Sequence, residues 1–149
     1  MITWSYKSFD QLLPGELYSI LRLRSEVFVV EQNCVFLDMD NKDLYCGHLM
    51  GWDGHLLAAY SRIVPAGVSY GENSIGRIVT SPAARGSGIG RELLVKSIDH
   101  LYTLYGKCPI RIGAQYYLKK FYESFGFVQK GEIYLEDGIE HIEMLLSNH

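Results

Sequence analysis

The segment that decides the fold is Ile75-Gly76-Arg77-Ile78-Val79-Thr80-Ser81-Pro82-Ala83-Ala84-Arg85-Gly86-Ser87-Gly88-Ile89-Gly90-Arg91. It predicts a strand, a short turn, a glycine-rich loop and a long helix from about Gly88 to Tyr105. Glycines at 86, 88 and 90 leave main-chain N–H groups unobstructed, and the helix start adds unpaired N–H groups and the positive end of its dipole. These features predict a site for a diphosphate-sized anion and therefore for a phosphorylated cofactor.

The spacing of the glycines excludes the common nucleotide-binding loops. A dinucleotide loop needs Gly-x-Gly-x-x-Gly, whereas the third glycine here comes one residue early. A triphosphate loop ends in Gly-Lys-Ser/Thr, but Gly90 is followed by Arg91. Ser87 lacks the glycines two positions to either side that a serine-hydrolase elbow needs. The remaining pattern is Arg-x-x-Gly-x-Gly over residues 85–90.

This pattern resembles the acetyl-CoA pyrophosphate loop of the GNAT superfamily of N-acetyltransferases. A second buried strand is predicted at Pro109–Ala114, and a short helical segment follows from Tyr116 to Phe127. The segment closes with Phe-Tyr-x-x-Phe-Gly-Phe over 121–127, which is similar to the GNAT segment that supplies a tyrosine general acid. Further stretches resemble the ElaA-like branch, so that the resemblance covers nearly the whole chain: residues 23–34, 112–115 and 134–142.

The resemblance implies one domain over residues 1–149 with an α/β fold. Its sheet is expected to be mixed and mostly antiparallel, with a central parallel strand pair splayed around acetyl-CoA and helices on both faces. The residues agree: Asp53-Gly54 and Asp137-Gly138 predict two hairpins, and the central strand-helix-strand order predicts a right-handed parallel crossover.

Composition bounds the class of protein. The chain is 48% apolar with a net charge of −3, which predicts a real core and excludes a nucleic-acid footprint. No apolar run approaches the roughly 20 residues of a membrane span, and Met1–Lys7 lacks a signal-peptide core. Three cysteines without a Cys-x-x-Cys pair favour a reduced cytoplasmic location. A homodimer is the commonest closed assembly and is the default expectation.

The resemblance also implies roles for residues. Tyr122 matches the general acid that protonates the departing thiolate, although an aromatic beside Phe121 and Phe125 is equally typical of a core. The oxyanion is expected to meet a main-chain N–H of Ile78 or Val79. The loop expected to hold the diphosphate comprises Arg85, Gly86, Ser87, Gly88, Ile89, Gly90 and Arg91.

The general base stays open among three residues. Glu31 follows an apolar run, His48 opens a strand, and His141 lies in the last strand, where an imidazole can titrate near neutral pH. Each has a structural alternative: Glu31 paired with Arg24, and either histidine hydrogen-bonded in the interior. A water chain is a further alternative. Arg24 itself lies on an apolar helix face and therefore needs a carboxylate partner.

Asp38, Asp40 and Asp43 invite a metal hypothesis, but their spacing fails the calcium-loop pattern. We therefore predict no metal and a solvated acidic loop, which near a cleft would attract a cationic amine. Cys34 has no histidine beside it in sequence and is predicted to be a buried thiol.

The sequence thus predicts an acetyl-CoA-dependent N-acetyltransferase. The acetyl group would pass to a primary amine of a small molecule or peptide by direct attack in a ternary complex. The alternative is a non-catalytic acyl-CoA-binding sensor or regulatory module that has kept the loop. Retention of Tyr122 favours the enzyme. No segment carries a recognisable code for the acceptor.

Overall fold

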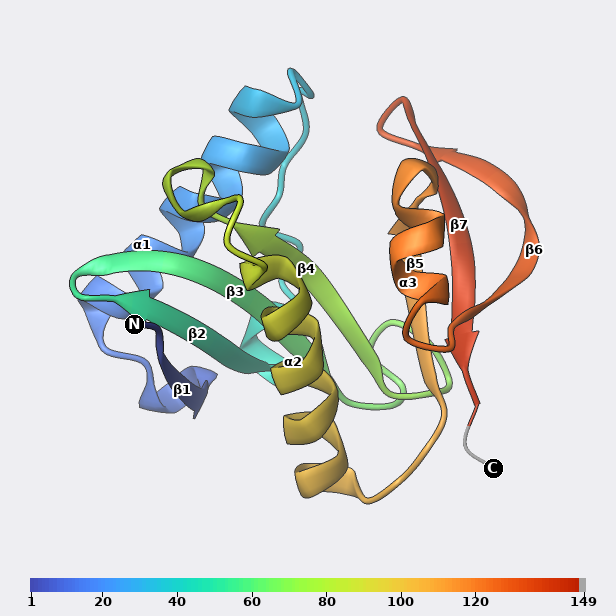
Figure 1. Ribbon diagram of the computed structural model, residues 1–149, viewed down its shortest axis with the longest axis horizontal. Coiled ribbons are helices and arrows are strands. Elements are labelled where there is room, and N and C mark those ends of the chain that lie inside the picture. The colour runs from blue at the N-terminus through green and yellow to red at the C-terminus, as the bar shows by residue number, and fades with distance from the viewer. Residues whose placement is uncertain (148–149) are drawn as a thin grey trace.

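The computed structural model describes residues 1–147, which form two antiparallel sheets whose neighbouring strands β4 and β5 approach at one end and diverge toward the other (Figure 1). The first sheet has the order β1-β2-β3-β4 and the second the order β5-β7-β6. The strands are β1 (Thr3–Ser8), β2 (Gly47–Asp53), β3 (Leu56–Val64), β4 (Ser74–Thr80), β5 (Ile110–Gln115), β6 (Val128–Glu136) and β7 (Ile139–Leu146).

Both predicted hairpins are confirmed. Asp53 pairs with Leu56, so that β2 and β3 are joined by a two-residue turn containing Gly54 at φ +60°. Asp137 and Gly138 connect β6 to β7 at φ +51° and +79°. Two successive positive φ angles define the turn whose twist matches an antiparallel pair, and Asp-Gly is a favoured sequence for it.

The prediction of a central parallel strand pair is wrong, because β4 and β5 form no parallel ladder. Among residues 1–147, one isolated parallel bridge joins Asn73 to Ile110, and Arg111 N donates to Asn73 O over 3.0 Å. Beyond this bridge β4 and β5 belong to different sheets. The register of β4 shifts opposite Ser61 by one extra residue, and a bulge of this kind bends its strand. The bend directs β4 away from β5.

The helices cover the first sheet on both faces, as predicted. The apolar side of α1 packs with Met50, Leu57 and Val79, whereas α2 packs with Leu49 and Ala58. The helical elements are η1 (Phe9–Gln11), α1 (Pro14–Arg24), η2 (Ser25–Glu31), η3 (Asp43–Tyr45), η4 (Pro82–Ala84), α2 (Ile89–Tyr105), η5 (Tyr116–Leu118) and α3 (Lys119–Glu123).

The segment η2 is π-helical. Gln32 N donates to Val27 O and Cys34 N to Val29 O, over 3.1 and 3.0 Å, which are five-residue spacings. The apolar pattern of residues 17–28 predicts one continuous α-helix, so that this change of pitch carries no sequence signal. Wide turns of this type are frequent at functional sites.

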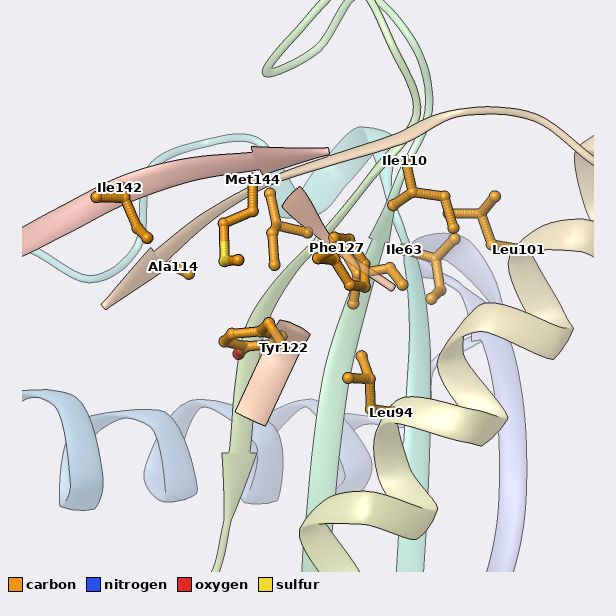
Figure 2. Packing of buried hydrophobic residues seen from close by; sticks show 11 residues of the cluster. Ile63, Leu94, Leu101, Ile110, Ala114, Tyr122, Phe127, Ile142 and Met144 are labelled. Carbon is orange, nitrogen blue, oxygen red and sulfur yellow. The ribbon is translucent and has the colours of Figure 1, made fainter. Parts of the chain in front are cut away.

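The largest core cluster joins the two sheets beneath α2 and α3 (Figure 2). Ile63 comes from the first sheet, Met144 from the second and Leu94 from α2, and all three are fully buried. Tyr122 of α3 lies at the edge of this cluster with its oxygen pointing away from the labelled aliphatic side chains (Figure 2). Within residues 1–147, no helix has the length and apolar character that crossing a membrane requires.

Candidate active site

A cavity of about 830 Å³ lies between the two sheets, within the size range of ligand sites. One wall is β4 together with η2, and the other comprises β5, α3 and the turn between β6 and β7. The cavity brings together the following predicted site residues: Glu31, Ile78, Val79, Arg85, Gly90, Tyr122 and His141.

The glycine-rich loop is open to a ligand. Gly86 and Gly88 have φ angles of +94° and +78°, which glycine adopts without strain, and Gly88 is the N-cap of α2. A Cβ added at Gly86, Gly88 or Gly90 would meet no protein atom within 4 Å. The loop therefore presents bare main chain at a helix start, which is the arrangement that binds phosphate groups.

Two of the predicted loop residues are placed so that only their main chain faces the loop. Ile89 is 4% exposed and packs with Leu49 and Leu93 in the core. Arg91 Nη1 donates to Ser124 Oγ over 3.1 Å, and its guanidinium carbon lies 4.4 Å from the Phe125 ring centre. Arg91 thus ties α2 to the end of α3 in this structure.

Arg85 forms a two-point ion pair with Glu31. Arg85 Nη1 and Nη2 each donate to one Glu31 carboxylate oxygen over 2.8 Å, and Nη2 also reaches Thr80 O at 3.2 Å. The hydrogen bonds from Arg85 hold the pKa of Glu31 below its usual range. A carboxylate whose pKa is lowered is a weaker base, so that this pair disfavours Glu31 as the proton acceptor. The alternative pairing of Glu31 with Arg24 is wrong.

Tyr122 is both buried and on the cavity wall. Its side chain is 5% exposed and packs edge-on to Phe121 and Phe127, with ring centres 5.3 and 6.0 Å away. Desolvation raises the pKa of its phenol, which keeps the hydroxyl protonated. Within residues 1–147 this hydroxyl makes no hydrogen bond. Tyr122 therefore contributes to the core through its ring while offering an uncommitted O–H.

His141 is nearly buried on the cavity wall, and its ring orientation is fixed by its neighbours. It is 7% exposed, it lines the cavity, and its ring stacks on Tyr134. Its Nδ1 lies 2.8 Å from Ile139 O, and only an N–H can face a carbonyl oxygen. A neutral ring would then carry its lone pair on Nε2, whereas a protonated ring would direct an Nε2–H toward Glu136 Oε2, which lies 3.5 Å away.

His48 lies outside the cavity lining. It is 1% exposed, Nδ1 lies 2.7 Å from Tyr60 Oη, and Nε2 lies 3.0 Å from Asp43 O. Both ring nitrogens are thus occupied in the interior, and burial lowers the pKa of this histidine. His48 is therefore a histidine hydrogen-bonded in the interior, which is the structural alternative to its role as a base.

The acidic segment is buried in ion pairs, and the prediction of a solvated loop is wrong. Asp38 and Asp43 are 5% and 8% exposed. The fully buried Arg24 donates from Nε to Asp38 and from Nη1 to Asp43, each over 2.7 Å. Arg62 donates to both carboxylate oxygens of Asp40 over 2.8 and 2.9 Å. The carboxylate partner that Arg24 requires is confirmed, and its identity came only from the fold.

Because arginines neutralise these aspartates, the segment cannot act as a free anionic attractant for an amine. Within residues 1–147, no cluster of three or more His, Cys, Asp or Glu side chains has the arrangement of a metal site. Cys34 is a buried thiol whose Sγ lies 3.1 Å from Asp137 O. This contact fastens the segment after η2 to the turn of the second sheet.

Side chains that the sequence did not single out close the cavity at two places. Gln32 and Gln115 pair across it at 3.3 Å, joining η2 to β5. The hydroxyls of Tyr70 and Tyr134 lie within 2.7 and 3.0 Å of the position a Cβ would take on Gly113. Gln32, Gln115 and Tyr134 lie in the stretches that resemble the ElaA-like branch, but these stretches are far apart in the chain and nothing in them signals that the side chains meet.

Known proteins share the sequence features of this chain. A family model of the acetyltransferase (GNAT) domain matches residues 28–147. Protein ElaA from Escherichia coli strain K12 is 40% identical over 146 residues, covering 97% of this chain and 95% of that protein.

Two solved structures are similar over the whole fold. A crystal structure of an acyl-CoA N-acyltransferase from Pseudomonas aeruginosa aligns with a TM-score of 0.94 at 40% identity, covering 99% of this chain and 100% of that one. The crystal structure of Escherichia coli ElaA aligns with a TM-score of 0.91 at 39% identity, covering 97% and 99%.

Proposed function

Because this chain belongs to the GNAT acetyltransferase family, we propose that it is an acetyl-CoA-dependent N-acetyltransferase that modifies a primary amine. The single observation that carries the proposal is the cavity whose lining includes both Gly90, at the start of α2 beside the open glycine loop, and Tyr122 of α3. A diphosphate at the loop and a thioester beside Tyr122 would occupy opposite ends of one continuous space.

The proposed binding step uses main-chain groups. N–H groups of residues 86–90 would hold the diphosphate, since the helix start leaves them without partners. Arg85 lies on the cavity wall beside the loop, but its guanidinium is paired with Glu31, so it would add positive charge to the site only by exchanging that carboxylate for a phosphate oxygen. The β4 main chain at Ile78 and Val79 would donate to the carbonyl oxygen of the thioester as negative charge develops there.

In the proposed reaction the amine nitrogen attacks the thioester carbonyl carbon, and the carbon–sulfur bond breaks with its electron pair leaving on sulfur. His141 Nε2 accepts the proton that the amine loses, and the Tyr122 hydroxyl donates its proton to the departing sulfur. Burial raises the pKa of the departing thiol as it raises the pKa of the Tyr122 phenol, so that proton transfer from the phenol to the sulfur stays feasible. Solvent then carries the proton from His141 back to Tyr122.

The test is release of free thiol from acetyl-CoA in the presence of a panel of amines. The panel contains polyamines, amino sugars, arylamines and lysine peptides, because the acceptor is not specified by the site. We expect at least one amine to give saturable, enzyme-dependent thiol release. Saturable coenzyme A binding without thiol release from any amine would instead support the non-catalytic binding module.

A further inference from the structure

Arg77 occupies the bulge of β4 in a conformation unusual for its residue type. Tyr60 pairs with Val79 and Arg62 with Gly76, so that Ser61 faces two residues, Arg77 and Ile78. The φ angle of Arg77 is +49°, a left-handed value that costs energy for any residue with a Cβ. Because a bulge leaves its extra residue outside the ladder, the main chain here is freed to face the cavity.

The Arg77 side chain is fastened to the buried segment after η2. Its Nη2 donates to Asp38 O over 2.8 Å, and its Nε lies 2.8 Å from Asp38 Oδ1. Asp40 Oδ2 lies 3.4 Å from Nη2. Asp38 is itself held by the fully buried Arg24 of α1. A continuous series of contacts therefore runs from the core of α1 to the bulge.

We propose that Arg77 is a positioning residue: its contacts with Asp38 hold the β4 bulge in the shape that aims the Ile78 and Val79 main chain at the thioester carbonyl. This inference rests on the proposed acetyl-transfer function. The physical argument is that a strained φ persists only where surrounding contacts fix it, and Arg77 has such contacts through its guanidinium. Glycine would adopt this φ freely, so the arginine is retained at a conformational cost.

Three variants separate the side-chain anchor from the backbone conformation. Arg77→Ala removes the anchor and keeps the strain of a Cβ at positive φ. Arg77→Gly removes the anchor and the strain together. Arg77→Lys keeps the charge but lacks the planar fork that contacts the carboxylate and the carbonyl of Asp38 at once. The matched control is Arg111→Ala, because Arg111 is a half-buried strand arginine paired with Glu72 and Glu143 outside the cavity lining.

Amide hydrogen exchange of the unliganded protein tests the anchor independently of activity. We expect Arg77→Ala to accelerate exchange of residues 76–80 by about tenfold or more, whereas Arg111→Ala leaves these amides unchanged. Unchanged exchange in Arg77→Ala would overturn the inference, even if the protein proves to be an active acetyltransferase. If no amine is acetylated by the wild type, the proposed function fails, and exchange still decides whether Arg77 fixes the bulge.

Kinetics with the best amine of the panel test the consequence for catalysis. We expect kcat to fall about 10- to 100-fold in Arg77→Ala, with the KM for acetyl-CoA within about threefold of wild type, since a small misplacement of catalytic groups has effects of this size. Arg77→Gly should recover part of the loss and Arg77→Lys should fall between wild type and alanine. Equal kcat values for the alanine variant and the wild type would overturn the inference.

Discussion

Replacement of Gly90 by valine tests the main-chain anion site directly. Gly90 is the second residue of α2, lines the cavity, and lacks the left-handed φ of Gly86 and Gly88. A Cβ there would contact no protein atom within 4 Å. The folded protein therefore accommodates the new side chain, whereas a ligand that approaches the bare main chain does not.

The expected loss follows from the hydrogen bonds that valine would prevent. A hydrogen bond to a charged group contributes about 1.5–3 kcal/mol. Loss of one such bond between Gly90 and the diphosphate weakens binding roughly 10- to 150-fold, at 1.4 kcal/mol for each factor of ten. The unfolding free energy should not fall, because valine has a slightly higher helix propensity than glycine.

The assay is calorimetric titration with coenzyme A, accompanied by thermal unfolding of each protein. Gly15→Val is the matched control, since Gly15 is also the second residue of its helix, α1, and also has open space around its Cβ position. We expect the control to bind coenzyme A like the wild type. Gly88→Val is less informative, because φ +78° at Gly88 would add backbone strain to any effect on the ligand.

A Gly90→Val protein that binds coenzyme A within twofold of wild type would refute the reasoning. Such a result would mean that the ligand does not approach the main chain at the start of α2. Equal weakening by Gly15→Val would refute it too, because the effect would then come from valine in a helix and not from the cavity.

Three further predictions concern the acid, the base and the ion pairs. Tyr122→Phe should lower kcat about 100-fold with little change in the KM for acetyl-CoA, because the hydroxyl acts only when the thiolate departs. Thermal stability should change little, since this hydroxyl makes no hydrogen bond within residues 1–147. A near-normal kcat in steady-state kinetics would exclude the acid role. His141→Asn retains a side-chain N–H donor for Ile139 O but removes Nε2, so we expect kcat/KM to fall about 100-fold. An unchanged kcat/KM would point to another base. The free energy of unfolding, measured with urea, should fall on acidification in two stages. Burial lowers the pKa of His48, so that the stability this histidine contributes is complete above about pH 6.5 and is lost as pH falls through the lowered pKa. Desolvation raises the pKa values of Asp40 and Asp43, but the ion pairs with Arg62 and Arg24 outweigh it and lower both values. A second loss of unfolding free energy therefore begins as pH falls below about 4. An unfolding free energy that stays constant from about pH 7 to 3 would contradict both assignments.

The local elements could be predicted because their signals are short-range. Alternating glycines before an apolar helix, and Asp-Gly between two apolar runs, act through backbone dihedrals over a few residues. The helix at Ile89–Tyr105 and the hairpin turns at Gly54 and Asp137-Gly138 are therefore observed where the sequence predicts them. The predicted parallel ladder failed because the bulge in β4 carries no comparable local signal.

The ion pairs could be predicted only in kind. Burial of Arg24 on an apolar face implies a carboxylate partner, but several acids lie within reach along the chain. Asp38 and Asp43 became the partners because the segment after η2 folds back over α1 and β3. Glu31 was then left to face the loop, where it pairs with Arg85.

The sequence by itself determined the two hairpin turns, the long helix α2, the open glycine loop and the family, because each depends on residue types at fixed short spacings. Tertiary structure alone decided which groups meet between the sheets: Tyr122 and His141 on one wall, and Glu31 withdrawn into an ion pair. Arg77 is the sharpest case, since its left-handed φ and its hold on Asp38 arise only when β4, α1 and the intervening segment come together. An ion pair depends on the distance between two charges in space, and the number of residues that separate them along the chain does not determine that distance.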